Sequence, residues 1–444
     1  MAAEPKDIPT LRIVTPEDVP ALEIDPICPK ALEQAREIVA DVAMNGKEAL
    51  IRQAVRLGDL PSADAPLLLD KDAMCAAFEA LPADEQTLLQ RTHDRVQNFA
   101  AQQLASLRPM ETDIPGGKAG HTISAVTTAG CYAPGGRYPL PSSVLMTAVT
   151  ARTAGVTTVV VASPRPAPVT LAAAHVAGAD LFLCVGGAQG IAALAIGVGG
   201  VPACDVIVGP GNKWVTAAKS IVQGRCAIDM LAGPSEVLVI ADATADPDVL
   251  AADLLAQAEH DVESRPILVT TDAAVAAAVN GRLQQRLMTL PTRETAAEAV
   301  RKGFAVVCTD MDAAVAVSDR VAPEHLEVMT ADAEAVGRRC NHYGGLFIGA
   351  GAAEVLGDYG AGPNHVLPTG GTGRYTGGLS VLNFVRVRTW MRVDDAAASQ
   401  QLVQDAVQLA RLEGLEGHAR AAECRLPGGG AAKKQKTAAT NGAA

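Results

Sequence analysis

The pattern of apolar and polar positions divides the chain into stretches of different character. Apolar residues recur at helical spacing over residues 28–57 and again over 84–107, and the first run is interrupted at Asn45-Gly46. Residues 109–129 alternate loosely around a Gly-Gly pair, which predicts a hairpin or a pair of strands. These three stretches therefore predict helix, helix and hairpin in chain order.

From about residue 131 onward, short apolar runs alternate with helical runs in two successive series. The first series ends near Pro234, and the second ends with a short strand at 344–349. Strands that alternate with helices of this length are typical of parallel sheets covered by helices on both faces. Residues 379–393 then resemble pairing strands, and an amphipathic helical region follows. The predicted fold class is α/β, with two parallel sheets and a small C-terminal helical and strand segment.

Composition and charge exclude some classes of partner. The chain of 444 residues has a formal net charge of -12 and no basic stripe, so it is a poor candidate for binding nucleic acid or an anionic membrane. Residues 181–204 carry no charge and are long enough to span a bilayer, but six Gly, a Pro and a Gln divide them into strand, turn and helix. We interpret this stretch as a buried βα unit.

Cysteine usage and the N-terminus indicate the compartment. The nine cysteines are odd in number and form no CxxC pair, and the first twenty residues contain acids and no apolar core of a signal peptide. We expect reduced thiols in a cytoplasmic protein. Residues 426–444 are of low complexity, and we expect them to be disordered.

One loop is dense in metal-binding and acid–base side chains. Residues 357–371, GDYGAGPNHVLPTGG, combine Asp358, Tyr359, Asn364 and His365 with Gly and Pro, which excludes a regular helix or a central strand. Binding groups gather on loops held by a rigid scaffold. The alternative is a surface turn whose Asp and Asn bond to their own backbone.

Two further pairs of residues are candidates for chemistry. Gln257 and His260 are three apart at a helix end and share a face, a spacing that suits two ligands of one metal ion, although a lone His there is more often a satisfied helix-end residue. Glu324 and His325 follow a Pro where we expect the chain to enter a helix, and together they form a natural acid–base couple. The alternative for Glu324 is a helix N-terminal acid in a favourable dipole position.

Gly-rich turns recur in the first βα series. They lie at 130–136, 185–191 and 208–214, and two of them directly follow a predicted strand. Glycine there lets backbone N–H groups approach a phosphate, and ligands bind beyond the carboxyl ends of strands in such sheets. The GxGxxG fingerprint is absent, so the spacing alone indicates a dinucleotide only weakly.

Taken together, these motifs resemble the histidinol dehydrogenase family. The resemblance rests on seven stretches that occur in the family's order and extends over roughly residues 27–425: GGAQGIAALAIG, VGPGN, IDMLAGPSEVLVIAD, AQAEHD, APEHLE, GDYGAGPNHVLPT and EGLEGH. That family uses zinc and NAD to oxidise L-histidinol to L-histidine through an aldehyde, the last step of histidine biosynthesis. An imidazole, a carboxylate and an amide oxygen, with a second imidazole, form a donor set that suits zinc.

The resemblance implies a role for each matching residue. The zinc ligands would be Gln257, His260, Asp358 and His418. The acid–base pair would be Glu324 and His325. The substrate would contact Ser235, Gln257, His260, His325, Asp358, Glu413 and His418, with His365 as a further contact. NAD would be held by Tyr132, Gln189 and Asn212.

The resemblance also implies an organisation into domains. We expect two Rossmann-like domains: an NAD-binding one at 131–236, inserted into a catalytic, metal- and substrate-binding one formed by 27–130 and 237–378. We expect an extended dimer-contact segment at 1–26, a swapped C-terminal dimerisation segment at 379–425, and a homodimer whose site is shared between subunits.

Some positions depart from the family pattern and leave the substrate open. Thr147 and Thr150 stand where the resemblance leads us to expect Asn and Pro, and RYTGGLSVLNF also differs. Relatives that oxidise sulfonated diols keep the zinc and Glu-His parts, so another small polar alcohol is an alternative substrate. Glu413 favours an amine, because a sulfonate would require a cation. A catalytically inactive binding paralogue is the alternative of another class.

Overall fold

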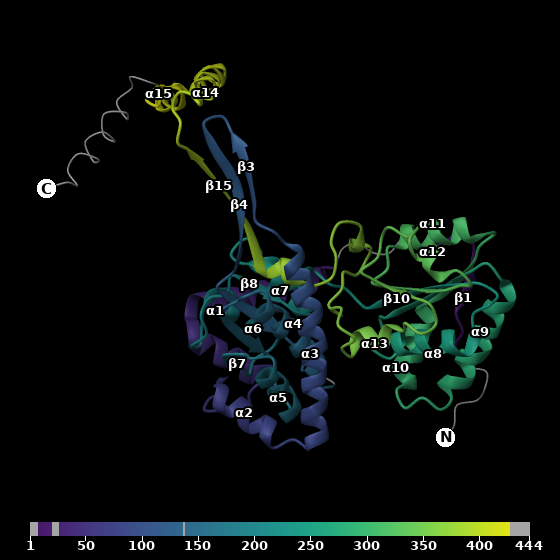
Figure 1. Ribbon diagram of the computed structural model, residues 1–444. Coiled ribbons are helices and arrows are strands. Elements are labelled where there is room, and N and C mark those ends of the chain that lie inside the picture. Colours follow the sequence, from purple (N-terminus) through teal and green to yellow (C-terminus); the bar gives the residue numbers. More distant parts are fainter. Residues whose placement is uncertain (1–7, 20–25, 136–137, 427–444) are drawn as a thin grey trace. The chain divides into compact units, whose positions relative to one another are not determined.

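The computed structural model describes residues 8–19, 26–135 and 138–426, and the chain divides into two compact units (Figure 1). Unit 1 comprises residues 1–104 and 126–384, and unit 2 comprises residues 105–125 and 385–444. Unit 1 contains two six-stranded sheets and unit 2 contains a three-stranded sheet. The α/β class with parallel sheets is therefore confirmed.

The second βα series forms one sheet of unit 1, in the order β1-β12-β11-β10-β13-β14, with all its strands parallel. The strands are β1 (Arg12–Val14), β10 (Glu236–Ala241), β11 (Arg265–Thr270), β12 (Phe304–Val307), β13 (His325–Met329) and β14 (Gly345–Ile348). Alternate residues of β10 enter two different cores. Val237 and Val239 belong to one hydrophobic cluster, and Leu238 and Ile240 belong to the other.

Each cluster is covered by its own helices. Figure 1 shows α8 and α10 on one side of β10, and α11 and α12 on the other. The covering helices are α8 (Pro247–Ala258), α9 (Ala273–Leu287) and α10 (Arg293–Lys302) on the first side, and α11 (Met311–Val321) and α12 (Ala333–Gly337) on the second. Because both faces are buried, the strands consist almost entirely of apolar residues, as the sequence pattern indicated.

The first βα series forms the other sheet of unit 1, in the order β2-β7-β6-β5-β8-β9. Its strands are β2 (Leu68–Leu69), β5 (Thr128–Tyr132), β6 (Thr158–Ala162), β7 (Leu181–Leu183), β8 (Val206–Val208) and β9 (Ala227–Ile228). Its helices are α1 (Pro29–Arg56), α2 (Lys71–Glu79), α4 (Pro141–Thr153), α5 (Pro168–Val176), α6 (Gly187–Ile196) and α7 (Lys213–Val222). The uncharged stretch 181–204 forms β7, α6 and a turn, which confirms the buried βα unit.

The sheet to which the N-terminal part belongs differs from the prediction. We expected residues 27–130 to belong with the second series, but α1 packs on α6 and α7, α2 packs on α5, and β2 pairs antiparallel with β7. The predicted extended segment 1–26 contains β1, which pairs with β12, while residues 1–7 and 20–25 lie outside the described residues. A strand as short as β1 or β2 has too few positions for a period to be recognised.

The long first helix contains the predicted break. Gly46 has φ +60 inside α1, a left-handed conformation that glycine adopts without the steric cost of a side chain. Helix α3 (Ala83–Ser106) follows α2 and contacts the loop that begins after Asp358. A Cβ on Gly360 would lie 2.4 Å from Cγ2 of Thr92 on α3, so this close approach requires glycine.

Unit 2 joins the predicted hairpin to the C-terminal segment. Strands β3 (Met110–Ile114), β4 (Gly117–Ala125) and β15 (Val385–Val393) form an antiparallel sheet in the order β15-β4-β3. The hairpin thus pairs with the C-terminal segment in unit 2, whereas we had placed it with residues 27–130 in the catalytic domain. Helices α14 (Gln400–Leu412) and α15 (Glu416–Glu423) pack on each other, and the buried core between them within the described residues consists of Val407, Ala410 and Ala419, with Ala422 partly buried against it.

Three general expectations have different outcomes. All nine cysteines lie in the described ranges and are free thiols. Within those ranges, none of the helices is both long and apolar enough to cross a membrane. The predicted disordered tail, 426–444, lies outside the described residues except for Leu426.

Candidate active site

The topology of the sheet β1-β12-β11-β10-β13-β14 brings several predicted site residues together at the amino-terminal ends of its strands. In a βαβ unit the helix runs back along the sheet, so the end of α8 lies near the amino ends of the strands. Gln257 is in the last turn of α8, Ser235 precedes β10, and His325 begins β13. In the register of the sheet, His325 lies opposite Val237 on β10 and Gly345 on β14.

The Glu324-His325 pair begins a strand. The expectation that this pair enters a helix was wrong, as was the alternative of a helix N-terminal acid, because α11 ends at Val321 and β13 follows. The signal that misled us is the Pro, which also occurs where a chain enters a strand. Both side chains are buried, with 6% exposure for Glu324 and 4% for His325.

The hydrogen bonds of His325 define its free nitrogen. Nδ1 lies 3.0 Å from the carbonyl oxygen of Glu236 and donates to it, which leaves Nε2 unprotonated in the neutral ring. Nε2 is buried, has no hydrogen-bond partner among the described residues, and lies 3.8 Å from Oδ1 of Asp358. Burial lowers the pKa of His325 to about 4, so the ring is neutral at physiological pH. His325 therefore presents a free basic nitrogen to Asp358.

Glu324 lies on the other side of the same imidazole. Its Oε2 is 3.7 Å from Nδ1 of His325 and accepts the backbone N–H of Glu236 at 2.9 Å. Burial raises the pKa of Glu324 well above its ordinary value, and the hydroxyl of Ser235 hydrogen-bonds to the carboxyl group. A carboxyl group with a raised pKa holds a proton closer to neutral pH, the property required of a general acid or base.

His260 and Asp358 converge from two different segments. Nε2 of His260 lies 3.6 Å from Oδ2 of Asp358, which ends the short helix α13 (Glu354–Asp358). Glu354, which the sequence analysis did not single out, lies 3.9 Å from the same nitrogen and completes a group of three possible metal-binding side chains. The i, i+4 spacing of Glu354 and Asp358 was the available signal.

Gln257 is fully buried beside this group. In the orientation that turns its amide nitrogen toward Glu354, this nitrogen donates to both carboxylate oxygens of Glu354, each at 3.0 Å, and lies 3.3 Å from Nδ1 of His325. An ionised carboxylate oxygen accepts hydrogen bonds and an amide nitrogen donates them, so the two contacts with Glu354 favour this orientation. It leaves the amide oxygen of Gln257 available as a ligand.

Side-chain hydrogen bonds of His365 and Asn364 hold the predicted loop 357–371 in place. His365 donates through Nδ1 to the backbone oxygen of Asp358 at 2.9 Å, and its Nε2 lies 3.4 Å from Oγ of Ser143. Asn364 donates to the carbonyl of Met146 and to the hydroxyl of Thr150, one of the two positions that depart from the family pattern. His365 thus fixes the backbone at Asp358. Asn364 accepts the backbone N–H of Val366 at 3.0 Å, as in the surface-turn alternative, but its amide nitrogen also ties the loop to α4.

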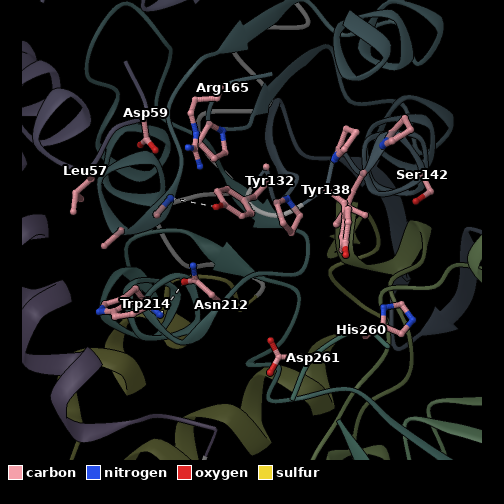
Figure 2. Close-up of a pocket in the computed structure, with 18 of the residues that line it drawn as sticks. Leu57, Asp59, Tyr132, Tyr138, Ser142, Arg165, Asn212, Trp214, His260 and Asp261 are labelled. Atoms are coloured by element: carbon pink, nitrogen blue, oxygen red, sulfur yellow. Dashed lines mark hydrogen bonds between the residues drawn. The ribbon is translucent and has the colours of Figure 1, made fainter. Parts of the chain in front are cut away.

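A cavity of about 1150 Å³ lies beside the group and is lined from both sheets. Its walls include all three predicted NAD contacts and two of the predicted metal ligands: Tyr132, Gln189, Asn212, His260 and Asp358. Figure 2 shows Asp59, Arg165, Tyr132 and Asn212 around one part of the cavity, and His260 near another. Tyr132 ends β5 and the other two follow β7 and β8, so these residues lie at carboxyl ends of strands, as predicted.

The side chains of the first sheet leave groups available for a ligand. Gln189 donates to Asp59 at 2.6 Å, and its buried Oε1 has no partner among the described residues. Gly187 donates its N–H to the hydroxyl of Tyr132 at 3.2 Å, and burial raises the pKa of that hydroxyl to about 12. Asn212 caps α7 through its oxygen, which leaves its amide nitrogen as the group that can reach a ligand. This unpartnered oxygen and these donors fit a polar dinucleotide.

The last two predicted residues belong to unit 2. Glu413 follows α14 and His418 lies in α15, and both are exposed. The candidate metal ligands that unit 1 holds are therefore Gln257, His260 and Asp358, with Glu354 in contact with Gln257. An imidazole, a carboxylate and an amide oxygen fit a zinc ion that still has positions open for further ligands.

The buried carboxyl group of Glu327, near the site, should make the stability of the fold depend on pH. Glu327 is fully buried on β13, and burial raises its pKa from 4.5 to about 8, with Asp253 adding to the shift. Between these two values the unfolded chain has lost a proton that the folded chain keeps, so stability falls by about 1.4 kcal/mol per pH unit as pH rises. Glu327→Gln removes this loss, so the thermal midpoint of the metal-free variant should gain on the parent from about pH 5.5 to about pH 7.5.

A matched variant tests whether burial is the cause. Glu334 is exposed, and Glu334→Gln should shift the midpoint equally at both pH values. A gap between Glu327→Gln and the parent that stays constant with pH would show that Glu327 is ionised in the folded chain.

Comparisons with known proteins identify the family and agree with this fold. The family model described as histidinol dehydrogenase matches residues 28–426. A histidinol dehydrogenase of Thermus thermophilus is 43% identical over 400 residues, which are 89% of this chain and 95% of the relative. A sulfopropanediol 3-dehydrogenase of Ruegeria pomeroyi is 40% identical over 403 residues, which are 89% and 92% of the two chains.

A solved structure extends the likeness to the fold. The crystal structure of histidinol dehydrogenase from Elizabethkingia anophelis superposes with a TM-score of 0.87 at 29% identity, covering 94% of this chain and 98% of that one. Two largely parallel sheets around a shared cavity, with an acid–base pair beside a possible metal site and a match to the histidinol dehydrogenase family model, define an α/β enzyme of the dehydrogenase class. The chain belongs to the histidinol dehydrogenase family.

Proposed function

We propose that this protein is a cytoplasmic zinc- and NAD-dependent dehydrogenase that oxidises L-histidinol to L-histidine through L-histidinal, with two NAD per turnover, as the last step of histidine biosynthesis. The observation that carries the proposal is the buried Nε2 of His325, which is unprotonated and 3.8 Å from Asp358. A free base next to a possible metal ligand is what the oxidation of an alcohol requires.

The residues divide the work between two half-reactions. When bound, zinc would orient the substrate and NAD would accept the hydride. His325 takes the hydroxyl proton through Nε2 as the carbon loses its hydride, which gives the aldehyde. Glu324 removes a proton from the water that adds to the aldehyde. His325 then takes the proton of the hydrate in the second oxidation, and the product is a carboxylic acid.

The remaining residues bind and orient. Gln257, His260 and Asp358 are the zinc ligands from one subunit, and His418 of a second copy is the fourth. Ser235 and His365 steady Glu324 and Asp358 respectively, and lie next to the substrate. Glu413 of the second copy pairs with the substrate ammonium. Tyr132, Gln189 and Asn212 hold NAD at the other part of the cavity.

The second candidate is oxidation of a sulfonated diol by the same groups. The 40% identity to a sulfopropanediol 3-dehydrogenase favours it. The deciding experiment measures NADH formation with L-histidinol and with sulfopropanediol, before and after chelation. We expect turnover of L-histidinol that chelation abolishes. Preferential turnover of sulfopropanediol would select the second candidate, and no turnover of either alcohol would favour a binding paralogue.

The proposed metal ligands can be tested by measuring the zinc content of variants. His260→Asn and Asp358→Asn each remove one of the donors that lie 3.6 Å apart, so zinc content measured by elemental analysis should fall well below that of the parent. His93→Asn is the matched control, because His93 pairs with Asp94 on α3 and should leave the zinc content unchanged. Full zinc occupancy in either of the first two variants would exclude that residue as a ligand.

A further inference from the structure

Glu354 is a buried carboxylate that the proposed mechanism does not use. It begins α13 and is 1% exposed. Its backbone N–H donates to Oε1 of Glu327 at 2.8 Å, so its position is tied to β13. A carboxyl group in such a position is costly, which calls for a role that repays the cost.

The contacts of Glu354 point to its neighbour on α8. Both of its oxygens lie 3.0 Å from the side-chain nitrogen of Gln257, and Gln257 is fully buried. A carboxylate only accepts hydrogen bonds, so it selects the orientation in which the amide nitrogen faces it and the amide oxygen faces away. A divalent cation binds an amide through its oxygen, so this selection decides whether Gln257 can be a ligand.

We propose that Glu354 is a positioning residue that fixes the amide of Gln257 with its oxygen available to the cation site of His260 and Asp358. This inference rests on the zinc site of the proposed function. The competing role is direct ligation, since Oε1 of Glu354 is 3.9 Å from Nε2 of His260. Its two oxygens already hold the Gln257 amide, which favours positioning.

The test is a double-mutant cycle on metal affinity. The full chain is stripped with a chelator and titrated with Co²⁺ or Zn²⁺ against a competing indicator, for the parent, Glu354→Gln, Gln257→Ala and the double variant. Loss of a residue that orients a ligand typically weakens metal binding about 10- to 100-fold, and this is the expected effect of Glu354→Gln. In the Gln257→Ala background the same change should alter affinity by less than about twofold, because the residue it acts through is gone.

Each other outcome is informative. Losses that add in the double variant would make Glu354 an independent ligand and overturn positioning, as would unchanged affinity in Glu354→Gln. The visible spectrum of bound Co²⁺ gives a second readout, since its ligand set should change in Gln257→Ala. A parent chain that binds neither cation would refute the proposed zinc site itself, which separates that failure from failure of the inference.

Two controls exclude a general effect of charge and a loss of folding. Glu263→Gln makes the same charge change at an exposed position close to His260 and should leave affinity unchanged. Thermal unfolding of the metal-free variants checks that each is folded. If Glu354→Gln does not fold, Glu354→Asp keeps the charge and withdraws it by one methylene, so it should weaken binding in the parent background and have little effect in Gln257→Ala.

Discussion

His325→Asn loses most of its turnover, by about 10²- to 10⁴-fold, while affinity for L-histidinol falls much less. The reason is that Nε2 is the unprotonated, unpartnered nitrogen facing Asp358, and asparagine supplies no comparable base. Steady-state kinetics gives the fall in kcat, and equilibrium binding of L-histidinol to the zinc-loaded variant gives the affinity.

A neighbouring variant separates the two half-reactions. Glu324→Gln should slow oxidation of the aldehyde more than oxidation of the alcohol, because Glu324 serves only the addition of water. An equal loss of turnover and binding in His325→Asn would reduce that residue to a binding role. An unaffected aldehyde step in Glu324→Gln would remove Glu324 from hydration.

Mixed dimers of two inactive variants recover activity. We expect His418→Asn and His325→Asn to be inactive alone, and heterodimers formed by subunit exchange to regain one competent site. That site receives His325 from one chain and His418 from the other. With random exchange in a twofold-symmetric dimer, about a quarter of the parental turnover per chain should return.

The structural reason lies in unit 2. Glu413 and His418 are exposed on a helical pair whose own buried core, within the described residues, consists of Val407, Ala410 and Ala419, while Leu409 and Leu412 are 59% and 84% exposed. An apolar surface of this kind on so small a core calls for a partner. Proven subunit exchange without recovery would mean that His418 serves its own chain.

The sequence predicts the parallel sheets because their strands are buried on both faces and therefore consist of apolar runs. It does not predict β1 and β2, whose two or three residues carry no period, nor that β4 pairs with β15 across more than 250 residues of chain. Register between distant strands depends on which faces become buried together, and a local pattern does not contain that information.

For the same reason, only some of the residues of the candidate site were predicted. Gln257, His260 and Asp358 were found through motif and resemblance, and the structure brings them together. Glu354 was missed although it lies four residues before Asp358, because its significance comes from contact with Gln257 across the fold. The strand start at His325 was missed because a Pro precedes strands as well as helices.

The two sheets contribute opposite ends of their strands to the site. The first sheet presents the carboxyl ends of its strands and the segments after them, with Tyr132, Gln189 and Asn212. The second presents the amino ends of its strands and the segments before them, with Ser235, Glu324 and His325. Substitutions in these two sets of segments therefore alter different parts of the site. A laboratory library directed at the segments around Ser235 and residues 359–371 can vary which alcohol is accepted while the dinucleotide half stays constant, which makes this scaffold suited to retargeting one half at a time.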